Sequence, residues 1–192
     1  MNAEHQQLCA SPEWTAYLRT DILPRLASGV DLGARMLEVG PGPGGATGWL
    51  CERVKWLTAL EVDPVAADAL ATRFSGTNVD VTVGDCARTT FADGSFDSVA
   101  SFNMLHHLPT LASQQAMLGE AFRLLRPGGV LIGSDSLASN DLHRFHADDV
   151  YNPIDPVRLL VMLQMLGCRP ITVVVGDELI FTAHKPDATQ GE

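Results

Sequence analysis

A glycine-rich segment, LEVGPGPGGAT, contains the residue types of a nucleotide-binding loop, and two patterns overlap in it. The first, G-x-G-x-x-G, consists of Gly40, Gly42 and Gly45 and is typical of a loop that binds the pyrophosphate of a dinucleotide. The second, E-x-G-x-G-x-G, consists of Glu38, Gly40, Gly42 and Gly44. Both allow the backbone to approach a ligand closely at the start of a helix, so the loop alone does not choose between cofactors.

Two carboxylates follow where a bound nucleotide could reach them. Glu61 lies 21 positions after Gly40 at the end of an apolar run, a spacing at which a carboxylate can bind ribose hydroxyls. Asp85 follows the next apolar run, so it is expected at the same edge of the sheet, where it could accept a hydrogen bond from an adenine amino group. Glu61 fits both glycine patterns, whereas Asp85 favours the one led by Glu38. A solvated capping residue is the alternative for Asp85.

The elements that must position these residues alternate from residue 35 onward between apolar runs and helical patterns. Such alternation predicts βαβ units and a parallel sheet covered on both faces. The expected strands of this core cover residues 35–39, 56–62, 79–83, 96–102 and 129–134. The expected helices between them cover residues 46–54, 64–74 and 111–125.

The chain closes with two further strands, 171–175 and 178–183, joined by Gly176 and Asp177. This tight connection predicts an antiparallel hairpin. A dinucleotide fold built from two βαβαβ halves would instead continue with parallel strands. The hairpin therefore disfavours the dinucleotide interpretation of the glycine loop.

Two helices are expected outside the core. The first covers residues 12–23, with Ser11 as N-cap and Pro24 marking where it ends or kinks. The second begins at Asp155, ends near Gly167 and contains the apolar stretch VRLLVMLQMLG. A buried helix is the simplest interpretation of this stretch, and a lid or dimer surface is the alternative.

Length and charge limit the functional classes. The 192 residues fit one domain, and 13 basic against 23 acidic residues give a formal net charge of -10, which disfavours nucleic acid as a partner. The four cysteines form no C-x-x-C pair, so neither a zinc site nor a disulfide framework is expected. The start of the chain, residues 1–11, has no signal-peptide pattern, and no apolar run is long enough to span a bilayer. We expect a cytoplasmic protein that does not enter membranes.

The chain resembles the class I S-adenosylmethionine-dependent methyltransferases. The resemblance covers about residues 35–135 and rests on an ordered set of segments: LEVGPGPGG, ALEVDP, VGDC, DGSFDSVASFNMLHHL and LRPGGVL. It implies an α/β, three-layer, Rossmann-like methyltransferase fold, whose mostly parallel seven-stranded sheet has the order 3-2-1-4-5-7-6 and an antiparallel terminal strand. We expect a single domain, 1–192, made of an N-terminal helical cap (1–34), a cofactor-binding core (35–135) and a substrate-side segment with the terminal hairpin (136–192).

The resemblance also implies S-adenosylmethionine as cofactor. The implied cofactor-binding residues are Glu38, Gly40, Gly42, Gly44, Glu61, Asp85, Cys86 and Asn103. The loop would bind the methionine part, Glu61 the ribose hydroxyls, and Asp85 with the Cys86 backbone the adenine. Asn103 would line the methionine side, and Gly45 would serve the close start of the following helix.

We expect methyl transfer to a small-molecule acceptor, with a homodimer left open. The alternatives are a nicotinamide-dependent oxidoreductase and a binding protein that holds S-adenosylmethionine without turnover. Because S-adenosylmethionine is already activated, the protein mainly has to align the acceptor and exclude water. An oxygen acceptor needs a base more than an amine does.

Histidines are the candidate catalytic bases because they titrate near neutral pH. His107 belongs with His106 to an LHHL segment that is common in the family, so a structural role is its alternative. His143 and His146 follow the fifth strand, where family members usually build substrate-binding elements. Their spacing with the acidic pair at 148 and 149 could suggest a metal site, but a charged loop is the commoner explanation, and no metal site is expected.

Overall fold

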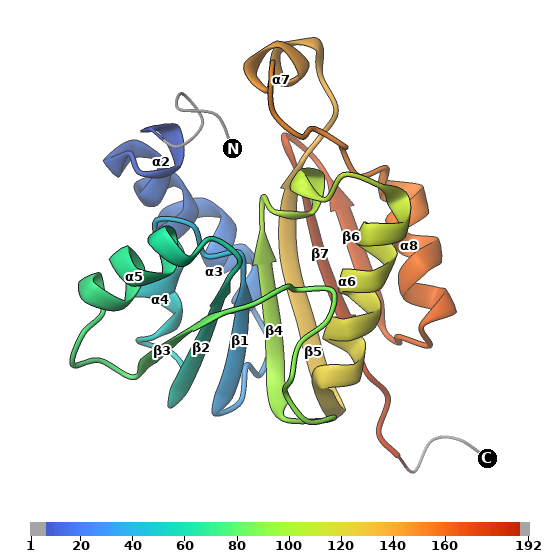
Figure 1. The fold of residues 1–192 in the computed structure, drawn as a ribbon. Helices are drawn as coiled ribbons and strands as arrows, with labels where there is room; N and C mark the ends of the chain where they lie inside the picture. Colours follow the sequence, from blue (N-terminus) through green and yellow to red (C-terminus); the bar gives the residue numbers. More distant parts are fainter. Residues whose placement is uncertain (1–6, 189–192) are drawn as a thin grey trace.

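The computed structural model describes residues 7–188 and contains a seven-stranded sheet with helices on both faces (Figure 1). The strands are β1 (Arg35–Val39), β2 (Trp56–Glu61), β3 (Val79–Val83), β4 (Phe96–Phe102), β5 (Leu125–Ser136), β6 (Ile171–Val175) and β7 (Glu178–His184). Their order in the sheet, β3-β2-β1-β4-β5-β7-β6, confirms the predicted fold class. The ends of the expected domain, 1–6 and 189–192, and with them the first half of the 1–11 segment, lie outside the described residues.

The sheet is parallel from β3 to β5 and antiparallel where β7 pairs with β5 and β6. The predicted terminal hairpin is therefore confirmed. β5 begins four residues earlier than expected, because Leu125 already pairs with Phe96 before the register shifts to Ser98 and Val130. The register shift falls at the segment 126–129, where Pro127 lacks a backbone donor. The helix ends before this segment, as predicted, but the strand begins before it as well.

Helices cover the two faces unequally. One face carries the N-terminal helical segment, α2 (Pro12–Tyr17), η1 (Leu18–Ile22) and α3 (Leu23–Ala27), together with α4 (Thr47–Leu50) and α5 (Pro64–Arg73). The other face carries α6 (Leu111–Leu124) and α8 (Pro156–Met165). Alternate residues of β1 supply both cores, since Met36 packs toward the first set and Leu37 toward the second. This arrangement buries the central strands on both sides, as a parallel sheet requires.

Two helices differ from the sequence expectation. The N-terminal helix does not end at Pro24 but continues to Ala27, because η1 is a π-helical turn in which the Leu23 N–H donates to the Leu18 carbonyl. Pro24 then falls in the first turn of α3, directly after the wider π-helical turn. α8 begins at its predicted cap, Asp155, but it buries only one face, and Met165 is 80% exposed on the other.

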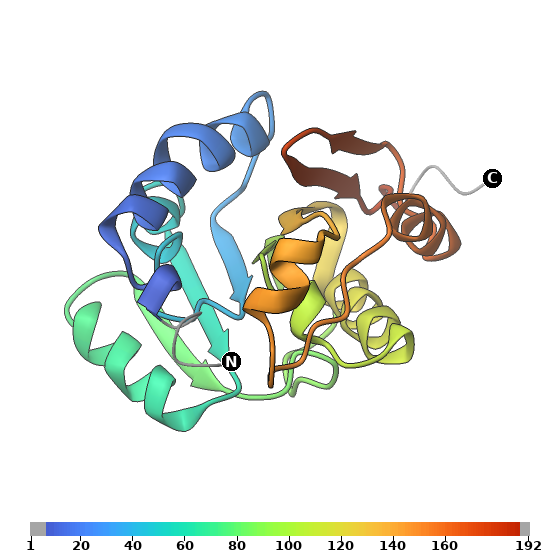
Figure 2. The same ribbon diagram turned by 90° about the horizontal axis from the view of Figure 1, so that it is seen from above.

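The carboxyl ends of the central strands form one edge of the sheet. A short helix that the sequence did not predict, α7 (Asn140–Phe145), follows β5 at this edge (Figure 1). Figure 2 looks down on the edge and shows α7 near the middle of the molecule, between the N-terminal helices and α6. No helix within residues 7–188 is long and apolar enough to cross a membrane.

Candidate functional site

A cavity of about 780 Å³ opens at the carboxyl edge of the sheet. That size suits a small-molecule ligand or cofactor. Seven of the eight residues predicted to bind the cofactor line it: Glu38, Gly40, Gly42, Glu61, Asp85, Cys86 and Asn103. They come from β1, β2, the turn after β3, and the end of β4, so the tertiary fold gathers residues that span 66 positions of the sequence. Gly44 is the exception.

The glycines of the loop after β1 have different surroundings. Gly40, Gly42 and Gly44 all have positive φ, a conformation that side chains rarely adopt. A β-carbon on Gly42 would have no atom within 4 Å, whereas one on Gly44 would lie 2.6 Å from Leu70 and 2.9 Å from Phe74 of the helix α5 region. Gly44 therefore serves packing against α5, and it is Gly45 that lines the cavity. The expected cofactor contact of Gly44 stays a prediction.

Glu61 ends β2 with its carboxylate fixed by the backbone. Oε1 accepts hydrogen bonds from the N–H groups of Val62 (2.9 Å) and Asp63 (3.1 Å), and Oε2 accepts one from Gly42 (3.2 Å). The side chain is 8% exposed, and it lines the cavity. These contacts hold a carboxylate beside the glycine loop in a single orientation, while leaving acceptor capacity for a ligand hydroxyl.

Asp85 lies at the start of the turn after β3. Its Oδ1 accepts a hydrogen bond from the Ala87 N–H at 2.9 Å, so it caps this turn, and it is exposed on the rim of the cavity. The capping role and the predicted ligand-binding role are therefore compatible at one position. Burial raises the pKa of the neighbouring Cys86 thiol to about 11, so this cysteine is a neutral thiol near pH 7.

Glu38 lies in the floor of the cavity and is 2% exposed. Its Oε2 accepts a hydrogen bond from the Thr47 hydroxyl at 2.7 Å. Burial raises the pKa of Glu38 to about 7, and the hydrogen bond from Thr47 opposes this shift. The acid is thus poised to ionise near neutral pH, and a cation bound in the cavity would favour the ionised form.

This raised pKa predicts a pH-dependent stability. Because the folded-state pKa of Glu38 exceeds its unfolded value, its stabilising contribution is present below about pH 4.5 and is lost as the pH rises through about 7. Glu38→Gln cannot ionise, so its free energy of unfolding relative to wild type should rise by roughly 2–3 kcal/mol between pH 4.5 and 8. Urea unfolding at several pH values measures the difference between the two proteins. Parallel pH profiles would contradict the assignment.

Asn103, at the end of β4, connects this cavity to a second one of about 340 Å³. Its φ of 48° is unusual for a residue with a side chain, and its backbone N–H donates to the Ser134 carbonyl at 2.8 Å. The side-chain oxygen accepts from the Ser136 hydroxyl, while the buried Nδ2 has no partner among the described residues. A buried amide donor is therefore available to a ligand where the two cavities meet.

The second cavity contains a carboxylate that the sequence analysis missed. Glu178 begins β7 opposite Ser136 of β5 and lines this cavity, and its Oε2 is buried without a partner among the described residues. Burial, followed by the nearby charge of Asp135, raises the pKa of Glu178 to about 7. No motif marks this residue, because only the pairing of β7 with β5 brings it to the site.

Two of the three predicted histidines line a cavity, and the third does not. His107, on the 3-10 helix η2 (Leu105–His107), lines the larger cavity, and His146, which caps α7, lines the second one together with His106. His143 is exposed on α7 and lines neither cavity. The grouping of His143 and His146 with the acidic pair at 148 and 149 does not form, since the ring of His146 lies with His106 and His107 instead.

Comparison with known proteins bears on this site. Residues 37–133 match the family described as "Methyltransferase domain". A phthiotriol/phenolphthiotriol dimycocerosates methyltransferase of Mycobacterium ulcerans is 32% identical over 133 residues, which are 68% of this chain and 48% of the relative. The Mycobacterium tuberculosis protein of that name is 30% identical over the same shares. The chain spans about half the length of the curated relatives it matches.

Solved structures agree with the fold. Phosphoethanolamine N-methyltransferase 2 of Haemonchus contortus, in complex with S-adenosyl-L-methionine, superposes with a TM-score of 0.74 at 17% sequence identity. The match covers 91% of this chain and 53% of the other. At this identity the likeness concerns the fold.

Proposed function

Because the chain belongs to the class I S-adenosylmethionine-dependent methyltransferase family, we propose that it transfers a methyl group from that cofactor to a small-molecule acceptor. The observation that carries the proposal is the pair of adjoining cavities. One is lined by the glycine loop and Glu61, the other by the segment after β5, and Asn103 belongs to both. A cofactor and an acceptor could thus meet beside one residue.

The residues of the larger cavity fit the cofactor. S-adenosylmethionine supplies a sulfonium-bound methyl group, its positive charge and an α-amino group, and a buried acid such as Glu38 complements positive charge. Gly42 leaves open space for close backbone approach, Glu61 presents a fixed carboxylate for ribose hydroxyls, and Asp85 lies where adenine is expected. We propose these four roles in cofactor binding for Glu38, Gly42, Glu61 and Asp85.

We propose a hydroxyl-bearing acceptor in the second cavity. The mycobacterial relatives are named for phthiotriol, a triol, which supports an oxygen acceptor for this chain. Glu178 and Ser136 offer hydrogen-bond acceptors and donors there, and a Glu178 pKa of about 7 allows this carboxylate to take a proton near neutral pH. His107, His143 and His146 stay predicted bases, and the cytoplasmic location and the homodimer stay predictions.

The test combines binding with turnover. Calorimetry should show S-adenosylhomocysteine binding at micromolar or lower Kd and no NAD binding under the same conditions, since Asp85 and the terminal hairpin disfavour a dinucleotide. A panel of alcohols, phenols and amines with labelled cofactor should then give methylated products among the hydroxyl compounds. Tight NAD binding without S-adenosylhomocysteine binding would overturn the proposal. Cofactor binding without any methylated product would favour a binding protein.

A further inference from the structure

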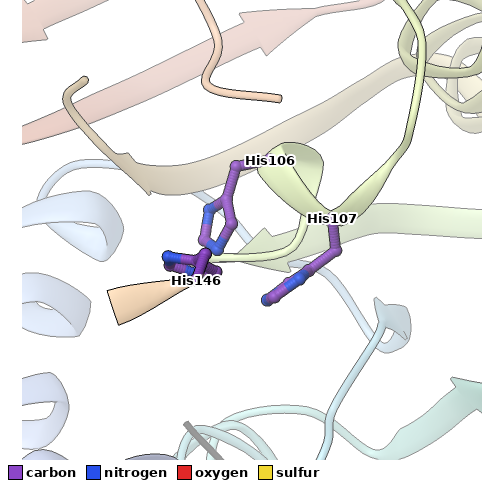
Figure 3. Close-up of side chains that lie close together, drawn as sticks. All are labelled: His106, His107 and His146. Atoms are coloured by element: carbon purple, nitrogen blue, oxygen red, sulfur yellow. The ribbon is translucent and has the colours of Figure 1, made fainter. Parts of the chain in front are cut away.

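Three histidine side chains meet where the two cavities adjoin. His106 and His107 come from η2 after β4, and His146 comes from the end of α7, some forty positions later (Figure 3). One ring nitrogen from each lies within 4.8 Å of the others, and the ring centroids of His106 and His107 are 4.2 Å apart. His106 and His146 are 2% and 4% exposed, so water does not solvate these rings freely.

The Nδ1 atoms of the two buried histidines are already engaged. His106 Nδ1 lies 2.6 Å from Oδ1 of Asp135, a fully buried carboxylate whose Oδ2 accepts from the Leu105 N–H at 3.0 Å. His146 Nδ1 lies 2.7 Å from the carbonyl oxygen of Leu142. A carboxylate and a carbonyl only accept, so each Nδ1 carries a proton, and in the neutral imidazole Nε2 is then the nitrogen with the lone pair. Metal-binding histidines are typically held in this way by a carboxylate or a carbonyl.

We propose that His106, His107 and His146 form a binding site for a divalent transition-metal ion, with zinc as the best fit. Imidazole nitrogens suit zinc, copper, iron and nickel, and three of them leave one tetrahedral position open to a small molecule. Bonds of about 2.0–2.1 Å place ligand nitrogens about 3.3 Å apart, so the rings must approach one another slightly through side-chain rotation. The four cysteines and the acidic pair at 148 and 149 are not part of the site.

The position of the cluster gives the ion a role. His107 lines the larger cavity, and His106 and His146 line the second, so the open position would lie where acceptor and cofactor adjoin. This role, unlike the site itself, rests on the proposed function. An acceptor hydroxyl bound to the ion would give up its proton more easily, and the Glu178 carboxylate of the second cavity is the proposed proton acceptor. Its oxygen then forms a bond to the methyl carbon, the carbon–sulfur bond breaks, and sulfur keeps the electron pair in neutral S-adenosylhomocysteine.

The experiment uses the full chain after removal of bound metal with a chelator. Zinc competition against a chromogenic chelator should show one equivalent bound to wild type, and Co²⁺ should give the visible absorption of a tetrahedral site. His146→Ala and His107→Ala should each weaken zinc binding by at least about 30-fold and change the cobalt spectrum, because each removes one of three ligands. His143→Ala is the matched control, an exposed histidine on the same helix, and it should bind zinc as wild type does.

Binding of S-adenosylhomocysteine to each variant shows that the fold is intact and keeps the two proposals separate. Zinc binding that is absent in wild type, or unchanged in both cluster variants, would overturn the metal site and leave the proposed methyl transfer untouched. Zinc binding without any S-adenosylhomocysteine binding would support the site and overturn the proposed function. Loss of zinc binding in His143→Ala alone would also contradict the cluster.

Discussion

Glu61→Ala should weaken S-adenosylhomocysteine binding by about 100-fold or more, because a charged acceptor for two ribose hydroxyls is lost and each such hydrogen bond contributes about 1.5–3 kcal/mol. The variant also removes the acceptor of the Gly42, Val62 and Asp63 N–H groups, so the glycine loop loses one of its contacts with β2 and keeps the one from Gly40 to Leu60. Calorimetric titration gives the affinity, and thermal unfolding separates this effect from loss of the fold.

Two variants sharpen the Glu61 experiment. Glu61→Gln keeps one oxygen for the backbone donors but lacks the charge, so its affinity should fall between those of wild type and Glu61→Ala. Asp68→Ala makes the same change of net charge on exposed α5, outside the cavity lining, and should bind as wild type does. Equal affinities for all four proteins would remove Glu61 from the proposed cofactor site.

Gly44→Ala should lower the free energy of unfolding by roughly 2–4 kcal/mol, because it adds a side chain at positive φ and overpacks the region around α5. Its β-carbon would lie 2.6 Å from Leu70, which is 2% exposed, and 2.9 Å from Phe74, which is 9% exposed, so neither neighbour can move away freely. Urea unfolding of the protein without ligand measures this loss.

Gly42→Ala, two residues away, should lower ligand affinity more than stability. Its φ is also positive, but the added β-carbon meets no atom within 4 Å, so the stability loss should be limited to about 1 kcal/mol of backbone strain. Because Gly42 lines the cavity, the methyl group should hinder the close backbone approach of a ligand, and S-adenosylhomocysteine affinity should fall by at least about tenfold, or 1.4 kcal/mol. Equal effects of the two variants on both stability and affinity would contradict the separate roles.

Local chemistry made most of the fold predictable. The strands around Met36 and Val99 are apolar runs that only a sheet covered on both faces can bury, and the Gly176–Asp177 turn allows only an antiparallel return. The caps at Ser11 and Asp155 were likewise visible, because an N-cap side chain satisfies backbone donors two or three residues away. Strand order followed from the family resemblance, since periodicity does not state which strands are neighbours.

Helix boundaries and burial were less predictable. Whether Pro24 ends a helix depends on the turn before it, and a π-helical turn allows the chain to continue. α7 is only six residues long, and such a short helix has a weak periodic signal. The exposed face of α8 follows from its outer position in the fold, because the same apolar composition is also consistent with complete burial.

The sequence by itself determined the fold class and seven residues of the larger cavity, because a glycine loop and the carboxylates after successive parallel strands occur at spacings fixed by the chain. Only the tertiary structure decided the different surroundings of Gly44 and Gly45, the place of Glu178, and the meeting of His146 with His106 and His107. These depend on contacts between segments that are far apart in the chain, and such contacts leave no periodic signal in either segment.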